Sequence, residues 1–210
     1  MFITFEGIDF SGKTTQAGLA VERLVSLGRR VKFVREPGGT ELSERIRSVL
    51  LAKTRLSIDP VSELLLFSAA RAQLVREVIL PSLRDGMIVV CDRFYDSTTA
   101  YQGYGRDLPL DDVRTINRFT TAGTTPGLTL FVDVTPEQIR RRKLRDGQAP
   151  DRMERSGDAF YEKVAEGYRQ IAREEPGRVV VIAGDGTVEE THEAVWREIG
   201  KKLTIIRDTQ

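Results

Sequence analysis

The stretch EGIDFSGKTT, at residues 6–15, decides the fold of this chain. It follows the short apolar run MFITF, which is typical of a buried strand. Four residues of the stretch match the pattern G-x-x-x-x-G-K-[ST]: Gly7, Gly12, Lys13 and Thr14. In that pattern the glycines let backbone N–H groups face phosphate oxygens, the lysine reaches the terminal phosphates, and the hydroxyl can bind Mg²⁺. An amphipathic helix expected over residues 13–27 would direct its positive end at the same anion. The stretch therefore predicts a nucleotide-binding loop between a strand and a helix, and the alternative is a turn that matches by chance.

Composition limits the classes of function. The 210 residues suffice for one sizeable domain with its own core. The net charge of +1 gives no overall field that would favour binding to nucleic acid or to an anionic membrane. No apolar run approaches the roughly 20 residues that cross a bilayer, and we expect no signal peptide before the first strand. The single cysteine, Cys91, excludes an internal disulfide. We expect a cytoplasmic protein that binds small molecules and neither nucleic acid nor membrane.

Strand and helix patterns alternate along the chain. This order predicts βαβ units, a parallel sheet and one α/β domain over residues 1–210. The expected strands are residues 2–6, 31–35, 87–92, 129–134 and 178–182, and the last four are continuous apolar runs typical of buried strands. The expected helices are residues 13–27, 41–51, 60–80, 111–121, 136–143, 158–174 and 188–203. Ligands of such sheets bind beyond the carboxyl ends of the strands, so the residues that follow each strand are the candidates for a site.

The helix expected over residues 60–80 has an unbroken apolar centre, LLLF at residues 64–67. Its apolar surface exceeds what one core contact needs. It is either a central buried helix or a helix that also packs on a partner subunit, and we favour the second, which predicts a homodimer.

Charged residues follow two of the strands. Arg35 begins the stiff turn REPGGT, where a guanidinium can grip a phosphate or pair with Glu36. Asp92, at the end of an apolar strand, can orient Mg²⁺ or its waters, and Arg93 offers a second phosphate clamp, although the two could also form a local salt bridge. Together with Lys13 these arginines supply more positive charge than one triphosphate needs. The pattern indicates two phosphorylated ligands that face each other.

Two further features point to a transfer reaction. Phe67 and Arg71 lie four residues apart on one helix face, where a ring and a guanidinium suit a flat heterocycle, although core packing is the commoner reason for such a pair. The basic stretch at residues 140–155 is either a solvated helix face or a mobile lid that brings an arginine to transferring phosphates. The only histidine, His192, lies far from every strand end, so catalysis would depend on positioning and charge neutralisation.

These stretches together resemble the thymidylate kinase family. The motifs GIDFSGKTT, REPGGT, LLLFSAARAQL, DRFYDSTTAYQ and APDRMER occur in that family's order. The resemblance implies a P-loop three-layer sandwich with a five-stranded parallel sheet, a lid at about residues 140–157, and a homodimer. It also implies phosphorylation of dTMP to dTDP with ATP and Mg²⁺. The alternatives are a kinase for another pyrimidine nucleotide or for a deoxynucleoside, and a non-catalytic nucleotide-dependent switch.

The resemblance also implies a role for each motif. ATP would be bound by Gly7, Ile8, Asp9, Phe10, Ser11, Gly12, Lys13, Thr14, Thr15, Arg142 and Arg145. The acceptor dTMP would be bound by Asp9, Arg35, Phe67, Arg71, Arg93, Ser97, Thr98, Tyr101 and Gln102. The catalytic residues would be Lys13, Asp9, Arg35, Arg93 and Arg145. Mg²⁺ would be held, largely through water, by Thr14, Asp9 and Asp92.

Some of these implied roles are more specific. Phe67 would stack on thymine, Arg71 would bond a base carbonyl, and Tyr101 would fill the space that a 2′-hydroxyl needs. The residues at 183–187 would border the adenine. Some members of the family carry a catalytic arginine inside the phosphate loop, where this chain has Phe10. The chain is therefore similar to the bacterial type, in which the lid supplies the arginine. Arg145 is our choice, and Arg142 and Arg152 are its rivals.

Overall fold

The core of the fold is a parallel sheet of five strands in the order β2-β3-β1-β4-β5. The computed structural model describes residues 1–52, 57–146 and 152–207. The strands are β1 (Phe2–Glu6), β2 (Val31–Arg35), β3 (Ile88–Asp92), β4 (Leu128–Asp133) and β5 (Val179–Ala183), and each lies within one residue of its predicted bounds. The expected α/β fold, a five-stranded parallel sheet flanked by helices, is confirmed.

The helices lie where the patterns predict them, with three differences. They are α1 (Lys13–Ser26), α2 (Glu41–Leu50), α3 (Pro60–Leu74), α4 (Leu80–Arg84), α5 (Tyr95–Thr98), α6 (Leu110–Thr120), α7 (Pro136–Asp146), α8 (Asp158–Glu174) and α9 (Val188–Arg207), with π-helical segments η1 (Val75–Ile79) and η2 (Thr99–Gly105) and the 3₁₀ turn η3 (Glu154–Ser156). The third helix continues through η1 into α4. The stretch after β3 is helical, as α5 and η2, although the apolar periodicity there predicts no helix. Finally, α7 and α9 run to Asp146 and Arg207, beyond their expected ends at residues 143 and 203.

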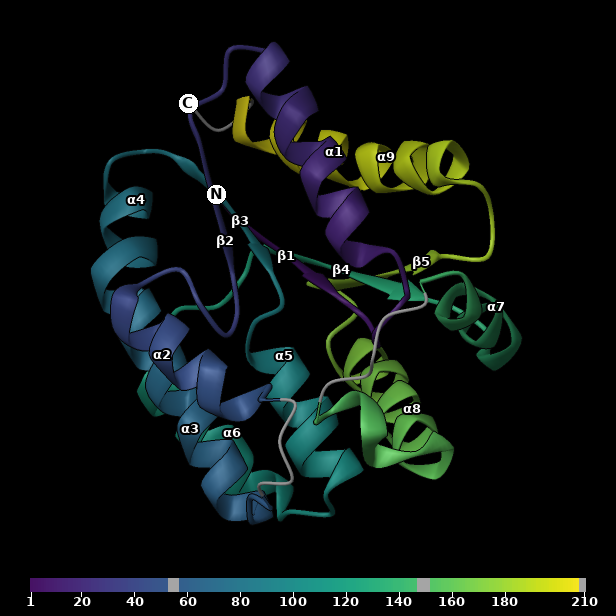
Figure 1. The fold of residues 1–210 in the computed structure, drawn as a ribbon. Coiled ribbons are helices and arrows are strands. Elements are labelled where there is room, and N and C mark those ends of the chain that lie inside the picture. The colour runs from purple at the N-terminus through teal and green to yellow at the C-terminus, as the bar shows by residue number, and fades with distance from the viewer. Residues whose placement is uncertain (53–56, 147–151, 208–210) are drawn as a thin grey trace.

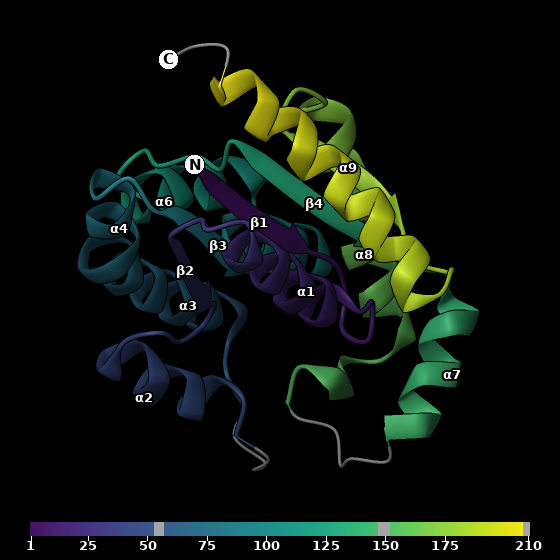
Figure 2. The ribbon, with the colours of Figure 1, turned by 90° about the horizontal axis from the view of Figure 1, so that it is seen from above.

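Helices cover both faces of the sheet. One face packs against α1 and α9, which lie side by side, and the other packs against α3, η1, η2 and α8 (Figures 1 and 2). Strand β1 shows why, because its side chains alternate between two cores. Ile3 and Phe5 pack in the cluster that contains Leu24 of α1, whereas Phe2 packs in the cluster that contains Leu74 of α3. None of the helices in the described ranges is long and apolar enough to cross a membrane.

The outer strands correct one expectation. Continuous apolar runs predict that β2 to β5 are buried, and β3 and most of β4 are. In the edge strands, however, Phe33 of β2 is 43% exposed and Val181 of β5 is 50% exposed. A strand at the rim of the sheet lacks a neighbour on one side and is only partly covered by helices, so apolar residues there stay accessible.

The topology places the candidate residues together. Strands β1 and β3 are neighbours, with Phe5 opposite Asp92. The phosphate loop follows β1, and Arg93 follows β3, so both emerge at the same carboxyl edge of the sheet.

Candidate active site

The loop between β1 and α1 has the backbone of a phosphate cradle. Gly7 has φ of +147°, and a Cβ atom there would lie 2.7 Å from both Ser11 Oγ and the carbonyl oxygen of Val132. Gly12 has φ of +93° and directly precedes α1, whose first N–H groups have no helical partner. Phe10 also adopts positive φ, at +65°, which is unusual for a residue with a side chain. The loop therefore curls as the sequence pattern predicts.

The hydroxyl of Thr14 and the carboxylate of Asp92 form a unit that suits Mg²⁺. Thr14 Oγ1 donates to Asp92 Oδ2 at 2.6 Å, which leaves the hydroxyl lone pairs available to a cation. Asp92 Oδ1 is buried and has no hydrogen-bond partner within the described ranges. Mg²⁺ prefers hard oxygen ligands and keeps several waters, so one hydroxyl and an acidic group that binds those waters match its needs. The described residues contain no group of three acidic, His or Cys side chains that could enclose an ion without water.

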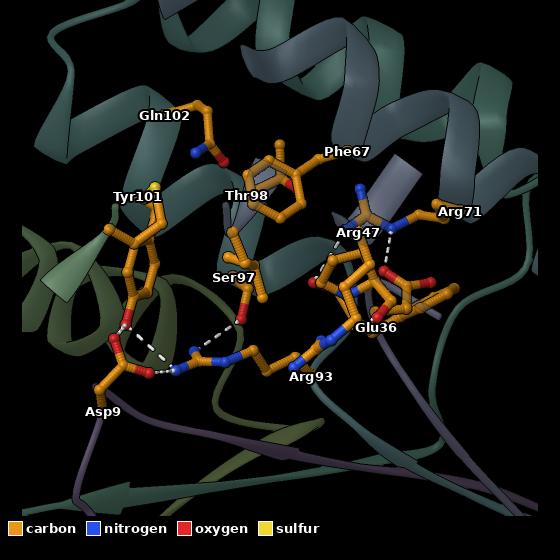
Figure 3. Close-up of a pocket in the computed structure, with 14 residues that line it drawn as sticks. Asp9, Glu36, Arg47, Phe67, Arg71, Arg93, Ser97, Thr98, Tyr101 and Gln102 are labelled. Carbon is orange, nitrogen blue, oxygen red and sulfur yellow. Dashed lines mark hydrogen bonds and ion pairs between the residues drawn. The ribbon is translucent and has the colours of Figure 1, made fainter. Parts of the chain in front are cut away.

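Arg93 joins the phosphate loop to a neighbouring pocket. Its Nη2 donates to Asp9 Oδ1 at 2.6 Å (Figure 3). Its Nη1 donates to the carbonyl oxygen of Gly7 at 2.8 Å. Lys13 Nζ lies 4.0 Å from the same Asp9 oxygen. Burial alone would raise the pKa of Asp9, but the charges of Arg93 and Lys13 outweigh it and hold the pKa at about 2. Asp9 is therefore ionised at neutral pH and links the two cations.

Hydroxyl groups surround the pair of Arg93 and Asp9, and one of them, Tyr168 Oη, accepts from Arg93 Nη1 at 3.2 Å. Tyr161, in α8, donates to Asp9 Oδ2 at 2.9 Å, and Tyr101 donates to the same oxygen at 3.3 Å. Ser97 lies within 3.2 Å of Arg93 Nη1 and donates to Glu6 Oε2 at 2.6 Å. Burial and the charge of Asp96 raise the pKa of Glu6 to about 7, against the hydrogen bonds from Ser97 and the Phe94 N–H that favour its charged form.

Beyond Arg93 the pocket has a flat apolar wall and a rigid guanidinium. Phe67 and Arg71 of α3 line it together with Thr98 and Gln102 (Figure 3). Arg71 is only 2% exposed, and its three nitrogens donate to Glu36 Oε2 at 2.7 Å, Asn117 Oδ1 at 3.2 Å and the Phe94 carbonyl at 3.2 Å. Burial outweighs the charge of Arg71 and raises the pKa of Glu36 to about 7. The guanidinium is thus held in one orientation while its remaining N–H groups are available to the pocket.

Arg35 is the predicted site residue that the structure does not bring into this pocket. Its Nη2 lies 3.2 Å from Glu44 Oε2, and the same carboxylate accepts the Gly39 N–H at 2.9 Å. The pair that the sequence suggests, between Arg35 and Glu36, does not form, because Glu36 is bound to Arg71. Arg47, which lies in α2, lines the pocket instead and donates to the Pro37 carbonyl at 2.9 Å.

The two rival lid arginines occupy different places. Arg142 donates to the carbonyls of Phe10, Ser11 and Gly184 at 3.0, 2.7 and 2.6 Å, so it ties α7 to the phosphate loop and to the loop after β5. Arg152 donates to the Leu50 carbonyl at 2.8 Å and pairs with Glu63, near the far end of the pocket. The side chain of Arg145 lies outside the described residues.

A second cavity opens on the other side of the phosphate loop. It has a volume of about 530 Å³ and is lined by the start of α1, by α7 and by the loop between β5 and α9: Ser11, Gly12, Thr15, Gln16, Gln138, Arg141, Arg142, Gly184, Gly186, Thr187, Val188 and Thr191. The residues at 184 and 187 fall within the stretch expected to border adenine. The phosphate loop therefore borders two cavities, one lined by Asp9 with Arg93 and the other by Ser11 and Gly12.

Comparison with known proteins identifies this arrangement. The model of the thymidylate kinase family matches residues 5–195. The chain belongs to the thymidylate kinase family. Its relatives include the thymidylate kinases of Chlorobium luteolum, 47% identical over 97% of this chain and 98% of the relative, and of Kosmotoga olearia, 47% identical over 94% of both. The crystal structure of thymidylate kinase from Ehrlichia chaffeensis matches with a TM-score of 0.77 and 36% identity over 95% of this chain and 98% of that one.

Membership of the thymidylate kinase family makes the chain a nucleoside monophosphate kinase and confirms the resemblance that the motifs suggest. Sequence reasoning did not identify Tyr161, Arg47, Glu36 or Glu63 as parts of the site. A signal for Tyr161 exists, because it and Tyr168 are seven residues apart and lie on one face of α8. The buried glutamates carry no such signal, since Glu is rarely buried and each is paired with residues distant in the chain.

Proposed function

We propose that the chain transfers the γ-phosphate of ATP to dTMP and forms dTDP. The observation that carries this proposal is the 2.6 Å contact between Asp9 of the phosphate loop and Arg93 of the neighbouring pocket. It joins an ATP-type loop to a second, base-sized pocket, so donor and acceptor phosphates would meet at one charged cluster. The acceptor phosphate is already an anion, and the reaction then requires positioning and charge neutralisation more than a base.

Each substrate has its own set of residues. The phosphate loop, from Gly7 to Thr15, holds the triphosphate of ATP with Lys13 at its terminal phosphates. On the acceptor side Phe67 stacks on thymine and Arg71 donates to a base carbonyl. Ser97, Thr98, Tyr101 and Gln102 line the remaining surface, and Arg93 binds the acceptor phosphate. Arg35 would have to leave Glu44 to reach that phosphate, a small cost because both side chains are largely exposed.

Mg²⁺ would be held by the Thr14 hydroxyl and, through water, by Asp92 and Asp9. When bound, it would neutralise charge on the bridging phosphate oxygens. A lid at about residues 140–157 would close over the phosphates and supply the catalytic arginine, for which Arg145 remains our choice. Arg152 is the weaker rival, since it is paired with the buried Glu63 away from the phosphate loop.

We also propose that the enzyme is a cytoplasmic homodimer. Val61 and Leu65 of α3 are 51% and 52% exposed and lie four residues apart on one helix face. Arg76 of η1, which continues α3, donates to the carbonyl of Phe119. Phe119, near the end of α6, is 78% exposed. This apolar surface along α3 and the end of α6 suits a partner subunit.

Steady-state assays with ATP and Mg²⁺ over dTMP, dUMP, dCMP, UMP and thymidine test the function. We expect the highest kcat/KM for dTMP. Equal or better use of UMP or thymidine would favour another nucleotide or nucleoside kinase. Nucleotide binding without turnover of any monophosphate would instead identify a switch.

A further inference from the structure

Glu63 is a completely buried carboxylate in the first turn of α3, at the edge of the base pocket. Its Oε1 accepts from Arg106 Nε at 3.2 Å, and its Oε2 lies 2.5 Å from Arg152 Nη1. A buried carboxylate is costly unless it is paired and hydrogen-bonded, and two guanidinium groups meet that need. The third partner is Gln102, whose Nε2 donates to Glu63 Oε1 at 2.9 Å. Because Arg106 and Arg152 already offset the charge of Glu63, the contact from Gln102 is not needed for charge pairing.

The contact with Glu63 fixes which end of the Gln102 amide faces the pocket. An ionised carboxylate accepts hydrogen bonds and donates none, so it must take the NH₂ end of the amide. Gln102 is only 1% exposed and lines the same pocket as Phe67. Figure 3 shows its amide oxygen turned toward the Phe67 ring. Across the described part of the chain no donor is bonded to that oxygen. The base pocket therefore contains an oriented hydrogen-bond acceptor.

This orientation matches one class of pyrimidine. Thymine and uracil present a carbonyl oxygen at position 4 and an N–H at position 3, which need a donor and an acceptor. Arg71 supplies the donor and Gln102 Oε1 the acceptor. Cytosine presents an amino group and a bare ring nitrogen at these positions, so both contacts would be mismatched. We propose that Glu63 is a positioning residue that makes the pocket selective for 4-oxo pyrimidines by fixing the Gln102 amide. This inference rests on the proposed function, because it assumes that the base enters this pocket.

The variant Glu63→Gln tests the inference with the full-length enzyme. A neutral amide at position 63 can accept or donate, so Gln102 becomes free to turn either end to the base. We expect the ratio of kcat/KM for dTMP to that for dCMP to fall by about tenfold or more, the scale of one hydrogen bond to the base. The ratio of dTMP to dUMP should change by less than about twofold, because these bases differ only in the 5-methyl group. A purely structural role would lower the activity on all three acceptors together.

Two further variants separate orientation from charge. Arg106→Gln removes a guanidinium from Glu63 but keeps the Gln102 contact, so its dTMP to dCMP ratio should stay at the wild-type value. The double variant Glu63→Gln, Arg106→Gln removes one charge of each sign, so it can be used if the single variant Glu63→Gln fails to fold. It should show the same loss of selectivity for dTMP over dCMP. The inference is overturned if folded Glu63→Gln, or the double variant, keeps the wild-type ratio, or if Arg106→Gln loses it equally. A wild-type enzyme that does not prefer dTMP over the other acceptors would instead refute the proposed function.

Discussion

The substitution Arg178→Met should destabilise the fold through one buried charge. Arg178 directly precedes β5, and its side chain is 10% exposed. It forms a bidentate salt bridge with Asp96 of α5, with Nη1–Oδ2 at 2.7 Å and Nη2–Oδ1 at 3.0 Å. It also donates to Thr129 Oγ1 at 2.8 Å. Methionine keeps much of the side-chain length but has no donor. Asp96, 3% exposed, would then retain only the hydroxyl of Thr129 at 3.3 Å.

Removing one partner of a buried ion pair typically costs about 3–5 kcal/mol, because the remaining charge is left without compensation. The lower end applies here, since Arg178 retains some contact with water and the Thr129 hydroxyl still serves Asp96. In a protein of this size 1 kcal/mol shifts Tm by roughly 2–4 °C, so Tm should fall by roughly 6–12 °C. Substituting Asp96→Asn in the Arg178→Met background removes the orphaned charge and should restore about 1–2 kcal/mol.

Urea denaturation and thermal scans of the four proteins in this cycle measure these effects. Arg173→Met is the matched control, because Arg173 pairs with Glu166 on the surface of α8 and both side chains are 57% exposed. That variant should lose less than about 1 kcal/mol. A loss below about 1 kcal/mol for Arg178→Met, or a further loss on adding Asp96→Asn, would refute the reasoning from buried charge.

Three further predictions concern the site. Arg145→Ala should lower kcat about 10³-fold or more if this arginine neutralises the transferring phosphate, and an unchanged kcat in single-turnover assays would exclude that role. Tyr101→Ala should raise the use of UMP relative to dUMP, whereas Tyr101→Phe, which keeps the ring, should not; equal ratios in all three proteins would contradict a sugar gate. Glu6 has a folded-state pKa of about 7, above its usual value of 4.5. Between these two pH values the folded state keeps a proton that the unfolded state loses, so stability should fall as pH rises from 4.5 to about 7. The denaturation free energy of Glu6→Gln should lack this part of the pH dependence, and parallel wild-type and variant curves would count against it.

Local sequence determines the sheet and the phosphate loop. The apolar run at β1 and the spacing of Gly7, Gly12 and Lys13 allow one backbone path, and positive φ at both glycines agrees with it. The bounds of the strands and most helices follow from periodicity for the same reason. Exposure of β2 and β5 could not be predicted, because it depends on the order of strands in the sheet. The helical stretch α5–η2 has no amphipathic repeat, and it is held by contacts with distant residues such as Glu6 and Asn117.

The partners of the predicted site residues were harder to predict than the residues themselves. Phe67, Arg71, Arg93 and Gln102 all line the pocket, as the motifs suggest. Arg35 does not, because Glu44 lies one helical turn into α2 and also accepts the Gly39 N–H. An ion pair between residues nine apart depends on the angle between a strand and the next helix, which no local pattern specifies.

Three glutamates explain why the pocket can be both polar and rigid. Glu6, Glu36 and Glu63 are at most 6% exposed, and each accepts a hydrogen bond from a different residue of the pocket lining. Glu6 accepts from Ser97 and from the backbone next to Arg93, Glu36 accepts from Arg71, and Glu63 accepts from Gln102. A carboxylate that accepts a hydrogen bond from a side chain fixes the orientation of that side chain. The remaining polar atoms of the side chain are then left for the ligand. Burial of carboxylates costs folding stability, and here the cost coincides with the positions that must recognise phosphate and base. Because the three pairings span 35 to 91 residues of sequence, this support for the site exists only once the sheet has formed.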